Sequence, residues 1–324
     1  MTELVEGLFI EAFGAPGDCL EDQARLSLAG LAEGGDHLAF TTDSYVVDPL
    51  FFPGGDIGAL AVNGTVNDLA VGGARPLYLS CAMIMEEGLP LETLARVTAS
   101  MQAAAGAAGV RIVTGDTKVV PRGAADGLFV NTAGIGVIPA GVEIGAARAR
   151  PGDCVLVSGP VGDHGAAIVD ARGELALEYD ILSDCAPLHG LVEAMLAACP
   201  RIRCLRDPTR GGLATVLNEF ARASGVALHL READIPVRES VRGLCEILGL
   251  DPLYLACEGR LAAVVPAEEA QAVLAAMRAH PHGAEAALIG EVRTAPAGSV
   301  ILETVLGGER LVDTLSGEQL PRIC

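Results

Sequence analysis

Aromatic and basic residues are scarce in this sequence of 324 residues. Trp is absent and aromatic residues make up 3%, which disfavours a stacking platform for single-stranded nucleic acid. Asp and Glu outnumber Lys and Arg by 42 to 22, so the formal net charge is −20. A surface of that sign repels phosphate backbones and anionic lipids. We therefore expect neither a nucleic-acid partner nor a membrane-surface role, although metal ions can bridge acidic side chains to a nucleotide.

Several familiar signals are also missing. No apolar run is long enough for a membrane-spanning helix, and the acidic start, Met1 to Glu6, lacks the basic segment of a secretory signal. The nine cysteines include no CxxC pair, which favours reduced thiols and a cytoplasmic location. The sequence contains neither a Walker A loop nor a GxGxxG loop, so neither standard phosphate loop is used.

What is present indicates a globular α/β protein. Hydrophobic residues make up 51% of the chain, and its length suggests about two domains. Strand and helix patterns alternate in both halves, which predicts a mixed α/β architecture. A segment rich in Gly and Pro at 139–153 is the candidate boundary. We expect an N-terminal domain over 1–140, a C-terminal domain over 141–315 and a mobile tail over 316–324.

Hydrophobic periodicity places the elements within these domains. We expect strands at 38–43, 77–85, 110–113, 128–137, 154–158, 227–230 and 261–265, and near 288 and 300. We expect helices at 4–13, 57–73, 91–108, 188–198, 212–223, 239–248 and 267–279.

Five acidic residues are the first candidates for chemistry, and they are Asp22, Asp43, Asp68, Asp116 and Asp207. Asp43, Asp68 and Asp116 lie directly beside Thr, Gly or Asn. We expect several of them at the ends of elements, where oxygen ligands could hold a hard cation and backbone amides could hold phosphate. Lys118 could reach a phosphoryl oxygen. The alternative for each carboxylate is an ordinary turn or cap residue, and for Asp116 with Lys118 a surface ion pair.

Two glycine-rich turns and one cysteine allow two interpretations each. Gly159-x-x-Gly162-x-x-Gly165 precedes a helix, as does Arg210-Gly211-Gly212. Either could be an anion site at a helix N-terminus or a tight turn that needs positive φ. The tight turn is favoured for the first, whereas Arg210 adds weight to phosphate binding at the second. Cys324 in the closing Pro-Arg-Ile-Cys is either an idle thiol or a thiol that is carried to a site and modified there.

Five stretches together resemble one family. They are Thr41 to Asp56 (TTDSYVVDPLFFPGGD), Val62 to Ala70 (VNGTVNDLA), Gly115 to Val120 (GDTKVV), Asp207 to Gly212 (DPTRGG) and Pro321 to Cys324 (PRIC). The sequence resembles the HypE family of hydrogenase maturation proteins, from about residue 3 to its last residue. The wider superfamily includes aminoimidazole ribonucleotide (AIR) synthetase, selenophosphate synthetase and thiamine-monophosphate kinase, and the terminal Pro-Arg-Ile-Cys separates HypE from them.

The resemblance implies a two-domain, AIR synthetase-like α/β fold. The strands of the N-terminal domain would join those of a second copy in a dimeric β-barrel, and ATP would bind between the two domains. It also implies an activity. Cys324 would receive a carbamoyl group from the carbamoyltransferase HypF, and the resulting thiocarbamate would be dehydrated to a thiocyanate at the expense of ATP. The cyanide would pass to iron on the HypC–HypD complex, for the [NiFe]-hydrogenase centre.

Residue roles follow from the family's motifs. Those implied for Mg²⁺ are Asp22, Asp43 and Asp207. Those implied for ATP are Thr42, Asp43, Asn67, Asp116, Thr117, Lys118 and Arg210. Glu258 and Asp68 are the candidates for proton transfer, Lys118 would also polarise the amide oxygen or the phosphate, and Cys324 is the carrier. The alternative is that neither residue has a chemical role. Glu258 would then be an acidic residue in a turn before Gly259, and Asp68 an acidic residue on a helix surface.

One departure and two alternatives accompany the resemblance. The Gly-rich segment with His and Gly-Gly that usually opens the family is missing before the first helix, which bears on how the nucleotide is enclosed. The alternative enzyme is a superfamily relative that acts on a small-molecule amide or phosphate and does not need Cys324. The alternative outside catalysis is a dimeric scaffold that docks partners through its acidic surface.

Overall fold

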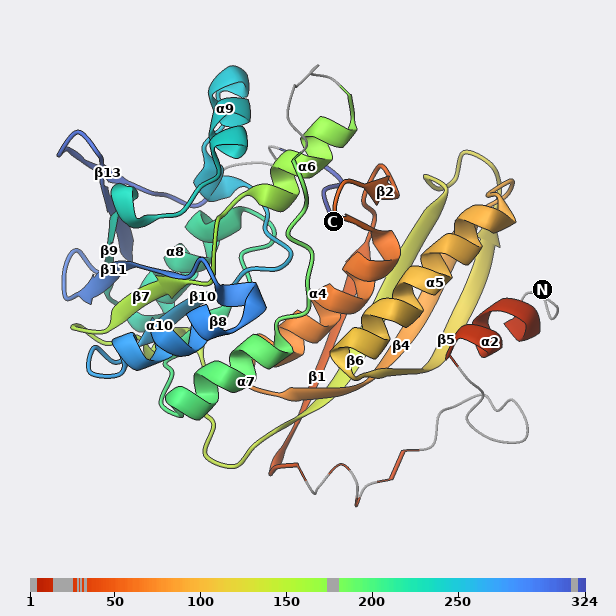
Figure 1. Cartoon of the computed structure of the whole chain (residues 1–324), viewed down its shortest axis with the longest axis horizontal. Coiled ribbons are helices and arrows are strands. Elements are labelled where there is room, and N and C mark those ends of the chain that lie inside the picture. Colours follow the sequence, from red (N-terminus) through yellow and green to blue (C-terminus); the bar gives the residue numbers. More distant parts are fainter. Residues whose placement is uncertain are drawn as a thin grey trace.

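The chain forms two lobes that lie side by side, each built on its own β-sheet (Figure 1). The computed structural model describes residues 5–13, 26–27, 29, 31, 34–173, 181–315 and 320–324. At the start, η1 (Val5–Ile10) and α2 (Glu11–Phe13) are helical, as expected for 4–13. The expected mixed α/β architecture in both halves is confirmed.

The first lobe contains a sheet of four strands in the order β1-β6-β4-β5 within the described residues. Its strands are β1 (His37–Tyr45), β4 (Arg75–Glu86), β5 (Arg111–Val120) and β6 (Leu128–Ile138). β6 pairs antiparallel with β1 and β4, whereas β4 and β5 are parallel and are joined by the crossover helix α5 (Leu91–Ala108). β1 and β5 are therefore at opposite edges of the sheet.

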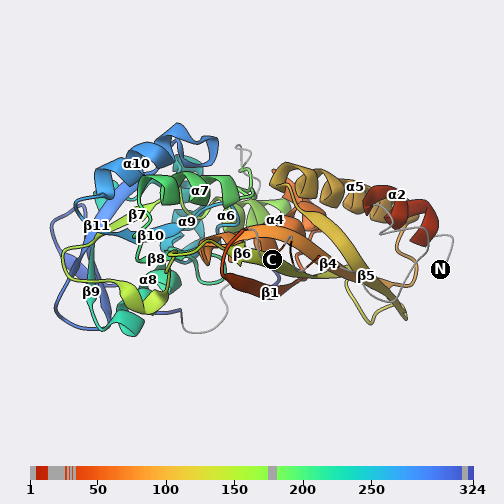
Figure 2. The same ribbon diagram turned by 90° about the horizontal axis from the view of Figure 1, so that it is seen from below.

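The two faces of this sheet differ. α5 and α4 (Ile57–Val71) cover one face (Figures 1 and 2). The other face, which we call the open face, carries large apolar side chains without a covering layer in the described chain. Leu38, Phe40 and Ile84 expose 59%, 70% and 42% of their surface there. Apolar groups exposed together on one face make that face a candidate surface for contact with another macromolecule.

The second lobe is a sheet of seven described strands in the order β13-β12-β9-β11-β7-β10-β8. These strands are β7 (Cys154–Val157), β8 (Cys204–Arg206), β9 (Ala227–Arg231), β10 (Ala262–Val265), β11 (Ala287–Arg293), β12 (Ser299–Glu303) and β13 (Glu309–Leu311). α8 (Gly212–Ser224) packs on one face, and α7 (His189–Ala198) with α10 (Ala270–Ala279) on the other. Two more helices, α6 (Asp163–Ala171) and α9 (Glu239–Leu248), lie at the end of this lobe.

α4 is buried almost all round because it lies between its own sheet and the second lobe. Its C-terminal Ala70 and Val71 belong to the same apolar cluster as α7 and α10. Gly64 allows close approach, since a Cβ there would lie 2.2 Å from the hydroxyl of Tyr45. Asp56 caps the helix, accepting hydrogen bonds from the amides of Gly58 and Ala59 at 2.7 and 3.1 Å. No helix in the described ranges is long and apolar enough to cross a membrane.

Most predicted elements are confirmed, and the differences have physical reasons. The strand expected over 110–113 continues to Val120, because its polar continuation lies on an exposed edge that requires no apolar alternation. The expectation that Asp116 follows a strand is thus wrong, since Asp116 lies inside β5. Asp43 likewise lies inside β1, and Asp68 lies inside α4. The short strands β2 (Phe51–Phe52), β3 (Gly55–Asp56), β8 and β13 were not predicted, because two or three residues carry too little periodicity.

Candidate functional site

Four carboxylates from both lobes converge where α4 meets the second sheet. Asp43 comes from β1, Asp68 from α4, Asp207 from the segment after β8, and Glu258 from the loop before β10. The amide of Cys257 donates to the carbonyl of Pro208 at 2.9 Å, which brings the segments of Glu258 and Asp207 together. We call these four residues the carboxylate cluster.

Burial and mutual repulsion raise the pKa of three members of this cluster. Burial, with the charges of Asp68 and Asp43, raises the pKa of Asp207 to about 7. Burial also raises the pKa of Glu258 well above its usual value, with contributions from Asp207, Asp184, Asp43 and Asp68. The pKa of Asp68 is raised by burial despite the hydrogen bond of 2.9 Å from the hydroxyl of Thr41. Opposite charge brought into the cluster would stabilise the ionised forms.

Glu258 has a fixed backbone and an unsatisfied side chain. Its amide donates to Oδ1 of Asp184 at 3.0 Å, and a Cβ on Gly259 would lie 1.8 Å from the carbonyl oxygen of Asp184. Buried Oε1 of Glu258 has no hydrogen-bond partner among the described residues. A buried carboxyl oxygen without a partner is costly. Oε1 of Glu258 is therefore available to contact a bound ligand.

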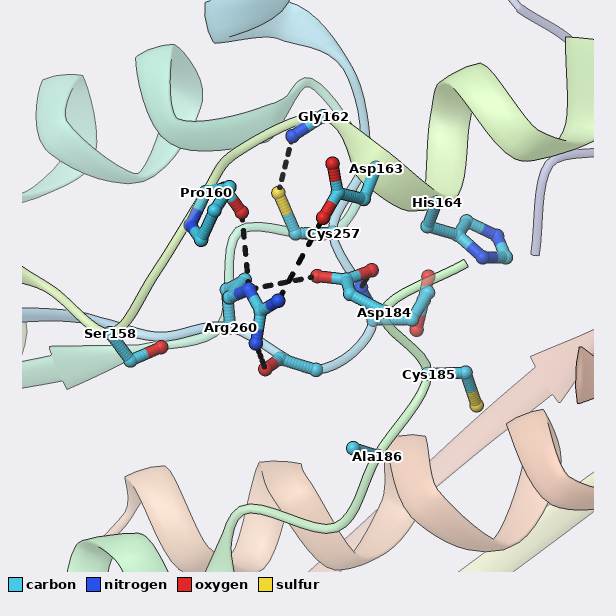
Figure 3. Close-up of polar contacts among 12 residues, drawn as sticks. Ser158, Pro160, Gly162, Asp163, His164, Asp184, Cys185, Ala186, Cys257 and Arg260 are labelled. Carbon is cyan, nitrogen blue, oxygen red and sulfur yellow. Dashed lines mark hydrogen bonds and ion pairs between the residues drawn. The ribbon is translucent and has the colours of Figure 1, made fainter. Parts of the chain in front are cut away.

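Arg260 forms an ion pair with Asp184 and so fixes the segment that carries it (Figure 3). Its Nε lies 3.6 Å from Oδ2 of Asp184 and donates to the carbonyl of Pro160 at 3.1 Å. Its Nη2 lies 3.8 Å from Oδ2 of Asp163, which also accepts a hydrogen bond of 3.0 Å from Arg238. These groups border a polar cavity of about 270 Å³. This layer of paired charges fixes the loop that carries Glu258.

Residues 320–324, which we call the docked tail, lie against the body of the molecule. The sequence predicts a mobile arm there, but the amides of Val46 and Asp48 donate to the carbonyls of Cys324 and Arg322 at 3.0 and 3.2 Å. Ile323 is buried and packs in the apolar cluster of the first lobe. Residues 316–319 of the expected tail lie outside the described residues.

The docked tail places Cys324 beside the carboxylate cluster. Burial, with the charges of Glu258 and Asp43, raises the pKa of its thiol to about 12, although Arg210 acts in the opposite direction through charge and a side-chain hydrogen bond. The thiol, the buried carboxyl of Glu258 and the guanidinium of Arg210 therefore share one environment. The sequence had placed all three in one site.

The glycines around Arg210 favour the tight-turn interpretation. Gly211 and Gly212 have φ of 75° and 60°, just before α8, and Gly162 has φ of 86° before α6. Residues with a Cβ rarely adopt such angles. The tight turn favoured at Gly162 is therefore present, and Gly211 with Gly212 forms such a turn next to Arg210, whose charge acts on Cys324.

Thr42, Asp116 and Lys118 lie on the open face, away from the carboxylate cluster. The register aligns Ser44, Asn131, Ala82 and Asp116 across the sheet, and directly paired residues share a face. Three strand spacings of about 4.8 Å separate β1 from β5, or about 14 Å. The ammonium of Lys118 lies 2.8 Å from Asp116, and these side chains are 68% and 64% exposed. Thr117 alternates with them and is half-buried.

Thr42 and Asn67 have partners within the chain. The hydroxyl of Thr42 donates to the carbonyl of Thr132 at 3.1 Å. The buried amide of Asn67 donates to the carbonyls of Ala186 and Glu258 at 3.0 and 3.2 Å and accepts from the amide of Leu188 at 2.7 Å. Asn67 therefore ties α4 to the segments that carry Asp184 and Glu258.

The carboxylate cluster fits a hard divalent cation. Asp22 lies outside the described residues, and within them no three His, Cys, Asp or Glu side chains are close enough to hold a metal ion together. Mg²⁺ commonly takes only one or two carboxylates and completes its octahedron with water and substrate phosphates. Asp43 and Asp207 supply such oxygens, and the orphaned Oε1 of Glu258 is nearby.

The sequence gave no indication of several residues around the site. Asp184 and Arg260 fix the loop of Glu258, and His164 and Arg172 contact the docked tail. Only His164 had a signal, because it lies in the Gly159-to-Gly165 turn that was singled out. Asp184, Arg260 and Arg172 bind main-chain groups or buried charges, and no local sequence pattern predicts such contacts.

Two family models match the chain. The N-terminal domain of AIR synthase related proteins matches residues 20–138, and the C-terminal domain of these proteins matches residues 150–303. Among curated relatives, carbamoyl dehydratase HypE of Rhodobacter capsulatus is 60% identical over 100% of this chain and 95% of its own length. Carbamoyl dehydratase HypE of Escherichia coli strain K12 is 54% identical over 100% of this chain and 96% of its own length.

Solved structures agree with these relatives. Hydrogenase maturation protein HypE in complex with ATP is 54% identical and covers 100% of this chain and 96% of that one, with a TM-score of 0.94. A HypE–HypF complex is 46% identical and covers 96% and 99%, with a TM-score of 0.84. The two lobes therefore have the AIR synthetase-like fold that the sequence suggested. This chain belongs to the HypE family of hydrogenase maturation proteins, the carbamoyl dehydratases among the AIR synthase related proteins.

Proposed function

We propose that this protein is an ATP-dependent carbamoyl dehydratase that acts on its own Cys324. In the proposed reaction the S-carbamoyl group on Cys324 becomes a thiocyanate, which supplies the cyanide ligand of the [NiFe]-hydrogenase iron. The observation that carries this proposal is the position of Cys324, which lies half-buried beside the buried Glu258 and within reach of the charges of Asp43 and Arg210. The names of the HypE relatives support the dehydratase activity.

The chemistry explains why ATP is needed. The carbamoyl oxygen attacks the γ-phosphorus of ATP, and the bond to the ADP oxygen breaks. The nitrogen then gives up its two protons, the C–O bond breaks, and phosphate leaves with the former carbonyl oxygen as the C≡N bond forms. Oxide is a poor leaving group, whereas phosphate is a good one. The protein's part is to position the groups and to neutralise charge.

Glu258 is the proposed base for the protons on nitrogen, with Asp68 as the second proton-transfer residue. A general base is most effective when its pKa is near the working pH, and burial moves Glu258 in that direction. Its fixed backbone and unpartnered Oε1 keep the side chain available. Arg210 is placed to stabilise negative charge on the oxygen or phosphate near Cys324.

ATP and Mg²⁺ are the proposed ligands of the cluster. A HypE relative has been solved with ATP, and we infer the same ligand here. Asp43 and Asp207, with Asp22, would hold Mg²⁺, which when bound neutralises charge on the transferring phosphate. Thr42, Asn67, Asp116, Thr117, Lys118 and Arg210 remain the proposed nucleotide residues.

A homodimer is the proposed working form. The open face presents Leu38, Phe40 and Ile84 to solvent, and a second copy packed there would complete the barrel expected of the family. It would also account for Lys118, which within one chain is about 14 Å from β1. A second copy is the way for Asp116 and Lys118 to join the site.

HypF and the HypC–HypD complex are the proposed partners. A HypE relative has been solved with HypF, and HypF would supply the carbamoyl group. Cys324 is largely buried in the docked tail, so the tail must leave its site when HypF modifies the thiol. The HypC–HypD complex would accept the cyanide.

Intact-mass spectrometry tests the proposed function. With HypF, carbamoyl phosphate and ATP, we expect a mass gain of one carbamoyl group followed by an ATP-dependent loss of one water. Cys324→Ala should show neither change. An unmodified Cys324 would favour the scaffold, and ATP turnover that survives Cys324→Ala would favour a superfamily relative acting on a small molecule.

A further inference from the structure

The docked tail is bound through its main chain. Every carbonyl from Pro321 to Cys324 accepts at least one hydrogen bond. On one side the amides of Val46 and Asp48 donate to the carbonyls of Cys324 and Arg322, in the alternating manner of a paired strand. These main-chain hydrogen bonds hold the tail in addition to the burial of the Ile323 side chain.

α6 supplies the other side of this site. Arg172, just after α6, donates from Nη2 to the carbonyls of Pro321 and Arg322 at 2.7 and 2.9 Å. Its Nε donates to the carbonyl of Asp48 at 3.1 Å, so one guanidinium joins the tail to the segment it pairs with. Hydrogen bonds from a charged donor are stronger than neutral ones.

His164 binds the remaining carbonyl from the interior. Its Nε2 lies 2.7 Å from the carbonyl oxygen of Ile323, which can only accept, so Nε2 carries the proton. Its Nδ1 then accepts from the hydroxyl of Ser183 at 2.8 Å. The side chain is fully buried, and burial lowers its pKa, which favours this neutral form.

The same histidine connects the tail to the loop of Glu258. Ser183, its partner, precedes Asp184, whose carboxylate accepts from the amide of Glu258 at 3.0 Å. Figure 3 shows His164 at the start of α6, beside the segment of Asp184 and Cys185. A chain of contacts thus runs from Ile323 through His164 and Ser183 to the backbone of Glu258.

We propose that His164 and Arg172 are positioning residues that hold the main chain of residues 321–323 and so keep Cys324 beside Glu258. This inference rests on the proposed function for its catalytic consequence, but not for the docking itself. The two residues act through the tail backbone and serve the dehydration step. Acquisition of the carbamoyl group, which needs the tail released, does not depend on them.

Alkylation of Cys324 tests docking without any assumption about the reaction. Arg172→Met leaves the half-buried aliphatic stem and removes two hydrogen bonds to the tail, so iodoacetamide should label Cys324 roughly tenfold faster than in the wild type. Digestion after Glu318 gives a peptide that separates Cys324 from the other cysteines. Arg201→Met is the matched control, because Arg201 pairs with Glu268 and Glu269 on the second lobe. An unchanged rate in Arg172→Met overturns the proposal.

His164 needs a paired design because it is buried. Gln places a donor near the position of Nε2, whereas Leu does not, so His164→Gln should keep slow labelling and His164→Leu should lose it. Circular dichroism and thermal melting establish that both variants are folded. Equal labelling rates in two folded variants contradict a role for the hydrogen bond to Ile323.

The reaction supplies the second readout. With HypF, carbamoyl phosphate and ATP, Arg172→Met should gain the carbamoyl group at the wild-type rate or faster and should lose water roughly tenfold more slowly. Equal dehydration rates with faster alkylation would overturn the positioning role while leaving the proposed function intact. If the wild type itself never loses water, the proposed function fails and the alkylation result still decides whether His164 and Arg172 dock the tail.

Discussion

Two groups of charged residues in this molecule carry the same kinds of side chain in opposite environments. Asp116 and Lys118 are largely exposed on the open face and are paired with each other. In the carboxylate cluster, Asp207 and Glu258 are buried at the junction of the lobes and Asp68 is half-buried, and the negative charges of the cluster raise the pKa of these three residues. The exposed pair is already satisfied within the chain, whereas the cluster is not. The cluster therefore has the larger free energy to gain from a bound cation or substrate.

The largest expected effect is on Glu258. Glu258→Gln keeps the size of the side chain but removes the base, so dehydration should fall by roughly 10²–10⁴-fold while carbamoylation of Cys324 continues. Intact mass should show accumulation of the carbamoylated protein. Because a buried carboxyl without a partner is removed, thermal stability should not fall. Retention of wild-type dehydration would remove Glu258 from the mechanism.

The next effect tests whether the exposed pair joins the cluster of a second copy. Lys118→Ala should slow dehydration on the order of 100-fold, because a cation near the phosphate is lost. Mixing and reassociating Lys118→Ala with Glu258→Gln should restore about a quarter of wild-type activity, since half of the dimers are mixed and each has one intact site. Absence of any recovery would mean that both residues act within one chain.

A smaller effect concerns Asp163, a buried carboxylate that does have cationic neighbours. Burial and then the charge of Asp184 raise its pKa from 3.8 to about 6, while Arg238 and Arg260 lower it. Because the pKa of Asp163 is higher in the folded than in the unfolded state, its protonated form stabilises the fold below about pH 4, and this contribution is lost as the pH rises toward 6. The unfolding free energy of the wild type should fall relative to that of Asp163→Asn by on the order of 1–3 kcal/mol across this window. Urea titrations between pH 4 and 7 measure it, and a constant difference would contradict this prediction.

The smallest effect is the stability of the exposed pair itself. Asp116→Ala should leave the free energy of unfolding nearly unchanged, because both partners are well solvated. Chemical denaturation of Asp116→Ala, with Arg148→Ala as the control for another exposed ion pair, provides the comparison. A clear loss of stability in Asp116→Ala but not in Arg148→Ala would mean that the open face depends on this pair, and the contrast with the cluster would weaken.

The sequence was informative where local pattern and motif agree. Helices such as α5 and α9 follow their apolar periodicity, and the motifs around Asp43, Asp207, Arg210 and Cys324 indicated residues that the fold brings together. Sheet order could not be read in this way. Asp116 was grouped with Asp43, yet β5 and β1 are opposite edges, and only the strand pairing reveals it.

Other parts of the site depend on contacts that leave no trace in local sequence. Arg172 binds carbonyl oxygens of residues 321 and 322, and every residue except the terminal one offers the same carbonyl. Asp184 binds an amide and a guanidinium supplied by a distant loop. Such partners are fixed by tertiary structure, so burial and hydrogen bonding had to identify them.

Backbone pairing with Val46 and Asp48, together with burial of Ile323, fixes the spacing of the last residues. One Ala inserted between Ile323 and Cys324 would leave a chemically normal thiol but move it by one residue, about 3.3 Å, relative to the groups that hold the tail. Such a variant keeps the reactive group and loses its place beside Glu258.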